Sequence, residues 1–193
     1  MIALAALVLT CAPLVAHDTA LALIEVESGG NPFAIGVVGG ALMRQPVNLA
    51  EAVATAAALD ATGWNYSVGL GQINKRNFQR FGLNPATAFE PCANLAAMQG
   101  ILGECFSRAS QRTSKQAALR NAFSCYYSGN FMTGHQHGYV GKVLTAWSSR
   151  AAPAATLHSA RVARAVLSQD TLSQAEFTPS SRFPTQELRN ESH

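Results

Sequence analysis

The chain has 193 residues, of which 48% are hydrophobic and 13% are charged, and this composition excludes a disordered polypeptide. Its length allows one domain of ordinary size plus a tail. Because no uncharged apolar run of membrane-spanning length follows the N-terminus, a polytopic membrane protein is also excluded. The net charge of +3 is too small to indicate nucleic-acid binding. Residues 75–120 nevertheless carry seven Lys or Arg against two Glu, which favours an anionic partner such as cell wall, phospholipid or nucleic acid.

The first predicted element is the apolar segment 1–16, which the pattern leaves open to two interpretations. It resembles the hydrophobic region of a signal peptide, but the preceding positive charge is missing. It also fits a first helix of the domain that ends near Cys11-Ala12-Pro13. A second helix is predicted over 15–28, where Gly29 and Gly30 stop it.

The remaining elements alternate short extended segments with helices. A short strand or hairpin is predicted over 34–42, a capped Ala-rich helix from 48 to about 61, and a strand-like segment with tight Gly turns over 64–73. Helical patterns follow near 74–81, 93–109, 115–127 and 137–149. The fold class is therefore mainly α, with a small β element beside a cleft in which chemistry would lie.

The last segment, 151–193, differs in composition from the rest of the chain. It is rich in Ala, Ser, Thr and Pro, and its four Arg balance its four acidic residues. We predict a mostly disordered tail, with a helical piece around 157–169. The expected domain then covers 11–150.

Four cysteines indicate disulfides or buried free thiols and not a zinc site. Cys11, Cys92, Cys105 and Cys125 form no C-x-x-C pair, and no His lies at zinc-ligand spacing from them. Four cysteines allow three connectivities. If 93–107 is a helix, about 20 Å separates Cys92 from Cys105, and these two cannot bond to each other.

Two acids, Glu25 and Glu27, end the helix before the Gly-Gly break and are candidates for proton transfer. They point roughly 200° apart around the helix, so at most one faces a given cleft. A carboxyl group at a helix C-terminus among apolar neighbours is disfavoured as an anion, and can serve as a general acid near neutral pH. The alternative is that both are solvated surface acids.

Four segments in order resemble the motifs of lysozyme-like lytic transglycosylases. They are 27–32 (ESGGNP), 67–74 (SVGLGQIN), 122–130 (AFSCYYSGN) and 138–143 (GYVGKV). The similarity is closest to the subgroup attached to type IV secretion and conjugation systems, through CAP at 11–13, the long insert 35–64 and CYYSGN at 125–130. Two positions depart from the broader family: Gly71 replaces Met, and Tyr127 replaces Asn.

The resemblance implies an α+β lysozyme-like fold in which Glu27 is the catalytic acid and base and Glu25 is not. It implies cleavage between N-acetylmuramic acid and N-acetylglucosamine with a 1,6-anhydro product, without metal or other cofactor. The substrate-binding residues that it implies are Ser67, Gly69, Leu70, Gln72, Tyr126 and Tyr139. It further implies a place in the periplasm or envelope of a Gram-negative bacterium, peptidoglycan as partner, and no nucleic acid. Secretion-system components would bind the tail 151–193.

Several alternatives stay open from the sequence. An inactive scaffold of the same fold would recruit secretion components, and a hydrolytic lysozyme would need a second carboxylate, for which Asp18 and Asp60 are poor candidates. Ser67 and Gln72 could serve their own turns, and the two tyrosines could be core residues. His135 and His137 are a weak metal signal.

Overall fold

The computed structural model describes residues 4–150, so the predictions for the tail 151–193 lie outside the described residues. The helices are α1 (Leu4–Cys11), α2 (His17–Ser28), α3 (Leu49–Ala61), α4 (Pro91–Ser110), α5 (Lys115–Ser128) and α6 (Thr133–Gln136). A further helix covers 139–150. The strands are β1 (Ile35–Val37), β2 (Tyr66–Val68) and β3 (Ile73–Asn74), and three 3₁₀ turns are η1 (Lys75–Asn77), η2 (Gln79–Phe81) and η3 (Thr87–Phe89). The predicted fold class is confirmed.

The strands form one small antiparallel sheet in the order β1-β2-β3. Ile35 pairs with Val68, and Val68 pairs in turn with Ile73, so one face of the sheet is apolar and buried. The edge strand β1 is closed by Gln45, whose side chain bonds both the N–H and the carbonyl of Ile35 at 2.8 and 3.0 Å. Main-chain groups that are hydrogen-bonded in this way are not available to pair with a further strand.

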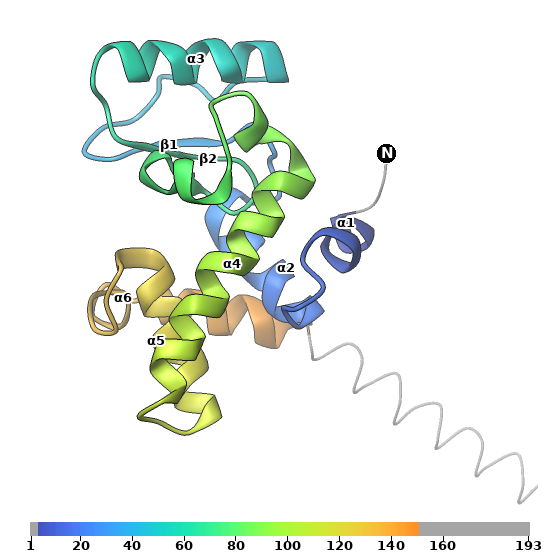
Figure 1. The fold of residues 1–193 in the computed structure, drawn as a ribbon, viewed down its shortest axis with the longest axis vertical. Helices are drawn as coiled ribbons and strands as arrows, with labels where there is room; N and C mark the ends of the chain where they lie inside the picture. The colour runs from blue at the N-terminus through green and yellow to red at the C-terminus, as the bar shows by residue number, and fades with distance from the viewer. Residues whose placement is uncertain (1–3, 151–193) are drawn as a thin grey trace, which may run out of the picture. The chain divides into compact units, whose positions relative to one another are not determined.

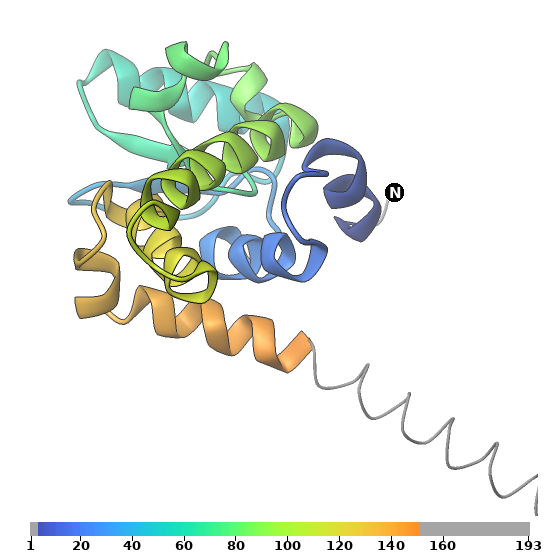
Figure 2. The same cartoon turned by 60° about the horizontal axis from the view of Figure 1, so that its bottom comes forward.

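Helix α4 runs through the middle of the described residues, with the sheet and α3 toward one end and α5 and α6 toward the other (Figure 1). Its buried face includes Leu95, Met98 and Leu102, which join one core with Leu23 and Ile24 of α2. The helix over 139–150 lies beside α2 (Figure 2), and Arg150 forms an ion pair with Glu25 there. None of the helices within 4–150 combines the length and apolar character needed to cross a bilayer.

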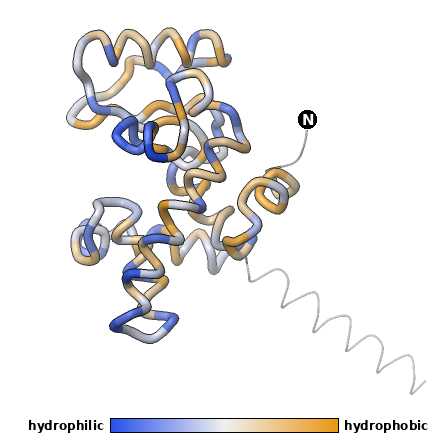
Figure 3. The backbone as a smooth tube through the Cα atoms, in the orientation of Figure 1, coloured by the Kyte–Doolittle hydropathy of each residue, from blue (hydrophilic) through white to orange (hydrophobic). Residues whose placement is uncertain are grey.

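Helix α1 packs into the same core. Val8 is 1% exposed, Cys11 is 9% exposed and the following Ala12 is fully buried. Figure 3 shows that α1 is hydrophobic along its length, whereas hydrophilic stretches gather at the 3₁₀ turns after β3 and at the α4–α5 connection. Within the described residues, α1 is therefore a helix whose buried side chains belong to the core.

Two disulfides hold the helices together, so of the two readings of the four cysteines the structure has disulfides and not free thiols. Cys11 bonds Cys92, which ties α1 to the start of α4, and Cys105 bonds Cys125, which ties α4 to α5. The pairing excluded from the sequence is indeed absent among these four cysteines, none of which is free.

The local signals for α3 are confirmed at its N-terminus. Asn48 Oδ1 accepts a hydrogen bond from the Glu51 N–H at 2.9 Å, and the Glu51 carboxylate accepts one from the Val47 N–H at 2.9 Å. The helix predicted over 74–81 is wrong, because that stretch forms the two 3₁₀ turns η1 and η2. Asn74 caps the first and Gly82, in a left-handed conformation, ends the second, which leaves too few residues for an α-helix.

Candidate active site

Glu27 lies in the last turn of α2 and lines a polar cleft of about 560 Å³. The sheet side of the cleft carries Ser67, Asn74 and Arg76, and the helical side carries Tyr126 and Tyr127 of α5. Gly29 follows in a left-handed conformation and its N–H bonds the Glu25 carbonyl at 3.1 Å, so α2 ends directly after the acid. Glu27 is the only acidic residue among those that line the cleft within residues 4–150.

The surroundings of Glu27 favour its protonated form. Burial raises the pKa of Glu27 from 4.5 to about 7, since a charged carboxylate loses its hydration there. A hydrogen bond from the Tyr139 hydroxyl opposes this rise by stabilising the carboxylate. The result is a carboxyl group that can both give and accept a proton near neutral pH.

Tyr139 donates its hydroxyl hydrogen bond to Glu27 Oε1 and is 6% exposed. Burial, followed by the charge of Glu27, raises the pKa of Tyr139, so its hydroxyl stays a hydrogen-bond donor. Tyr127 stacks on the Tyr139 ring with centroids 4.6 Å apart, and the Tyr127 hydroxyl lies 3.2 Å from His137 Nδ1. Stacking against an aromatic ring fixes the position of Tyr139 beside the carboxyl group.

Glu25 lies outside this arrangement. Its side chain is 48% exposed and forms an ion pair with Arg150 on the helix over 139–150. The two acids that the sequence analysis compared therefore have different surroundings, one buried beside a cleft and one paired at the surface.

The turn between β2 and β3 contributes Gln72 to the cleft wall, and a buried Asn94 holds this turn in place. Asn94 Oδ1 accepts from the Gly71 N–H at 2.7 Å, and its Nδ2 donates to the Val68 and Ala88 carbonyls at 2.9 and 2.7 Å. A side chain at Gly69, whose φ is +76°, would collide with Asn94 at 2.3 Å. The turn therefore requires glycine where it meets this amide.

Two further hydrogen bonds fasten the same turn to the helices. Ser28 Oγ donates to the Leu70 carbonyl at 2.9 Å, and the Tyr126 hydroxyl donates to the Gly71 carbonyl at 2.5 Å. Because Ser28 directly follows Glu27, its bond ties the turn to the end of the helix that carries the acid.

The structure brings most of the predicted site residues to the cleft, but in different roles. Ser67, Gln72 and Tyr126 line it, whereas Leu70 is 2% exposed and Gly69 builds the turn. Ser67 Oγ accepts from Asn74 Nδ2 at 3.2 Å, a partner on the neighbouring strand.

Gln72 serves its own turn, as one alternative expected. Its Nε2 donates to the carbonyls of Ala34 and Gly69, each at 3.1 Å, and it takes a φ of 47°. Gln72 therefore closes the loop while its side chain stays in the cleft wall.

The other candidate groups are held elsewhere in the described residues. Asp60 pairs with Lys75 at 2.7 Å, and Asp18 lies beside His17, so neither lines the cleft with Glu27. His135 contacts Asn121 while His137 contacts Tyr127. Within 4–150 no group of three or more His, Cys, Asp or Glu could hold a metal ion.

A second cavity of about 420 Å³ lies between the α1–α2 connection, α4 and α5. Its lining is almost entirely apolar, with Leu14, Leu102 and Phe106 prominent. No acidic residue lines it within residues 4–150.

Comparison with known protein families matches residues 8–146 to the transglycosylase SLT domain. The chain belongs to this family. Over 141 residues the SLT chain is 50% identical to the type IV secretion system protein virB1 of Brucella abortus, covering 69% of this chain and 59% of the relative. It is 39% identical over 140 residues to the protein virB1 of Agrobacterium fabrum, covering 70% and 56%.

The SLT chain thus spans less than two thirds of the length of these relatives. No solved structure matches it significantly. The family assignment confirms the resemblance that the four sequence motifs indicated.

The cleft is also lined by residues that the motifs did not single out. Asn65 and Arg76 lie outside the quoted motifs, Asn74 ends one of them, and Tyr127 stands where the broader family often has Asn. The buried Asn94, which holds the β2–β3 turn, lies outside the motifs too. Strand alternation around Ser67 would have placed Asn65 on the same face. Asn94 gave no signal, because a single Asn in an apolar helix does not show which loop it meets.

Proposed function

We propose that this SLT domain cleaves the β-1,4 bond between N-acetylmuramic acid and N-acetylglucosamine in peptidoglycan, and that Glu27 performs both proton transfers. The observation that carries the proposal is a single buried carboxyl group, with a pKa raised to about 7, at a polar cleft. An ordinary two-carboxylate glycosidase would need a second acid across the cleft.

The proposed reaction conserves atoms without water. Protonated Glu27 gives its proton to the glycosidic oxygen as the bond from the muramoyl C1 to that oxygen breaks. The muramoyl 6-hydroxyl oxygen then bonds to C1, and the Glu27 carboxylate takes the hydroxyl proton. The products are a 1,6-anhydromuramoyl end and a free N-acetylglucosamine 4-hydroxyl, and Glu27 is protonated again.

Other cleft residues would bind and position the sugar strand. Gln72 and Tyr126 present polar and aromatic surface in the cleft, and Ser67 adds a hydroxyl. Tyr139 would hold Glu27 and lower the cost of its anionic state. Gly69 and Leu70 would act through the shape of the turn.

The proposed setting is the periplasm or envelope of a Gram-negative bacterium. Two disulfides support an oxidising compartment, and the similarity to virB1 proteins supports a role in opening the wall for secretion or conjugation machinery. Components of that machinery are the proposed partners, with the tail 151–193 as their binding segment.

A matched pair of substitutions tests the enzymatic role. Glu27→Gln keeps size and hydrogen bonding but cannot supply a proton, and should reduce the rate of wall cleavage by roughly 10⁴-fold or more, because one group serves both steps. Glu25→Gln removes a carboxylate two residues away and should leave the rate nearly unchanged. If Glu27→Gln digests isolated cell walls as fast as the parent, the scaffold function takes the place of the enzyme.

A further inference from the structure

One face of the β2–β3 hairpin forms a polar row along the cleft. Ser67 pairs with Asn74 in the sheet register, Asn65 lies two residues before Ser67 and directly precedes β2, and Arg76 lies in η1 two residues after Asn74. Side chains two apart on an extended strand share a face, which groups Asn65 with Ser67, and all four of these residues line the cleft. The residues between them face the other way, where Tyr66 and Ile73 are buried.

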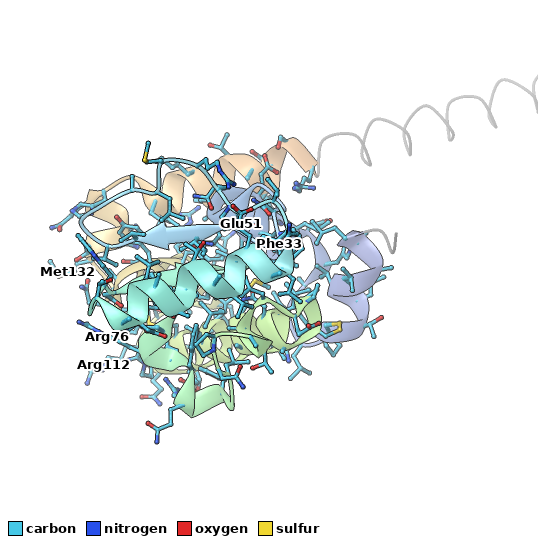
Figure 4. All side chains as sticks on the ribbon, turned by 90° about the horizontal axis from the view of Figure 1, so that it is seen from above. Phe33, Glu51, Arg76, Arg112 and Met132 are labelled. Atoms are coloured by element: carbon cyan, nitrogen blue, oxygen red, sulfur yellow. A yellow bond between two sulfur atoms is a disulfide. The ribbon has the colours of Figure 1, made fainter. Side chains whose placement is uncertain are left out.

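Arg76 gives this row its only positive charge. It is the only Lys or Arg that lines the cleft in the described part of the chain, and it forms no ion pair within 4–150. Its neighbours differ in this respect, since Lys75 pairs with Asp60 and Arg80 pairs with Glu104. Arg76 is exposed at the periphery of the molecule, as Figure 4 shows.

Asn65 adds an unused acceptor to the same row. Its Oδ1 is buried and has no hydrogen-bond partner among the described residues. A buried amide oxygen without a partner is costly unless a ligand donates to it. The row therefore combines the Arg76 guanidinium, which has no anionic partner among the described residues, with Asn65 Oδ1, which has no donor there.

We propose that Arg76, together with Asn65, forms a subsite for a carboxylate of the glycan strand and an amide N–H near it. This inference rests on the proposed function, because it takes peptidoglycan as the ligand. Arginine suits this role since its planar guanidinium binds carboxylates with two parallel hydrogen bonds. The carboxylate has two sources: a muramoyl lactyl group without a peptide, or the acidic residues of a stem peptide.

The test measures binding separately from cleavage. Soluble glycan strands are titrated into the full chain carrying Glu27→Gln, alone and combined with Arg76→Gln. The second substitution should weaken binding roughly three- to tenfold at low salt, and the loss should shrink as salt screens the charge. Arg112→Gln is the matched control, because Arg112 is also an exposed arginine (Figure 4) but lines a different cavity.

Three forms of the strand identify the anion. Peptide-bearing strands offer only stem carboxylates, peptide-free strands offer lactyl carboxylates, and strands with all carboxyl groups amidated offer neither. An Arg76 effect on the first or second form identifies the source and supports the subsite. An equal effect on amidated strands, no effect on any form, or the same effect from Arg112→Gln overturns it.

Cleavage of the same strands by the parent chain separates this inference from the proposed function. If the parent does not cleave them but Arg76→Gln weakens binding, the proposed reaction fails and the subsite stands. If the parent cleaves them and Arg76→Gln leaves the affinity for the strands unchanged, the subsite is refuted and the proposed reaction is supported.

Discussion

The burial of Glu27 predicts that Glu27→Gln stabilises the protein in a way that depends on pH. In the folded chain the pKa of Glu27 is about 7, against an ordinary value of 4.5. Folded Glu27 thus binds its proton more tightly than unfolded Glu27, and its contribution to stability is full below pH 4.5. That contribution is lost as the pH rises through 7.

The size of the effect follows from the difference between these two pKa values. Each pKa unit corresponds to about 1.4 kcal/mol, so ionising buried Glu27 removes about 3 kcal/mol from the free energy of unfolding above pH 7. Gln has similar size, accepts the same hydrogen bond from Tyr139 and does not ionise. The substitution should therefore be nearly neutral at pH 4 and stabilising by about 3 kcal/mol at pH 8.

Thermal or urea unfolding of the disulfide-bonded full chain at several pH values between 4 and 8 measures this difference. A gain of about 3 kcal/mol corresponds to a rise in Tm of roughly 6–12 °C for a chain of this size. Glu25→Gln is the control, because its exposed side chain pairs with Arg150 and should give no such pH-dependent gain. A constant difference between Glu27→Gln and the parent from pH 4 to 8 would refute the burial of this acid.

Three further substitutions test contacts that hold the acid, the turn and the helices in place. Tyr139→Phe removes the hydrogen bond that stabilises the Glu27 carboxylate, so the pKa of Glu27 should rise. The high-pH limb of kcat/KM should then move about one pH unit higher, and an unmoved limb would contradict this role of Tyr139. Asn94→Ala removes the hydrogen-bond partner of three main-chain groups and should lower the free energy of unfolding, measured in urea, by about 2–4 kcal/mol. A loss under 1 kcal/mol would show that the β2–β3 turn keeps its conformation without Asn94. Replacing Cys11 and Cys92 by Ser opens a bridge that spans 81 residues, and replacing Cys105 and Cys125 opens one that spans 20. Because the longer loop restricts the unfolded chain more, the free energy of unfolding should fall by about 4.5 kcal/mol for the first and by about 3 kcal/mol for the second. A larger loss from the shorter bridge would contradict this entropic effect.

Local signals in the sequence predicted the elements that local chemistry determines. Asn48 and Glu51 predicted the start of α3, and Gly29 predicted the end of α2 directly after the candidate acid. Helix geometry predicted that at most one of Glu25 and Glu27 faces a given cleft, and of the two only Glu27 lines the cleft while Glu25 pairs with Arg150.

Contacts between distant residues could not be predicted in the same way. The bond from Tyr139 to Glu27 joins positions 112 residues apart, and the bonds from Asn94 reach the turn 23 and 26 residues earlier. No spacing in the chain encodes such contacts, because the first depends on how the helix over 139–150 packs against α2 and the others on how α4 packs against the sheet. The same reason explains Leu70, whose place in a motif suggested ligand contact but whose side chain lies in the core.

The mass of the product formed from purified cell walls distinguishes the anhydro-forming reaction of Glu27 from hydrolysis. Full-length protein and the Glu27→Gln variant are incubated with walls, and the released muropeptides are weighed by mass spectrometry without chemical reduction. We expect the parent to release products lighter by one water than a reducing-end muropeptide, and Glu27→Gln to release almost none. Products with a reducing-end muramic acid would show hydrolysis instead, and release of anhydro products by Glu27→Gln at the parent rate would contradict the assignment of Glu27.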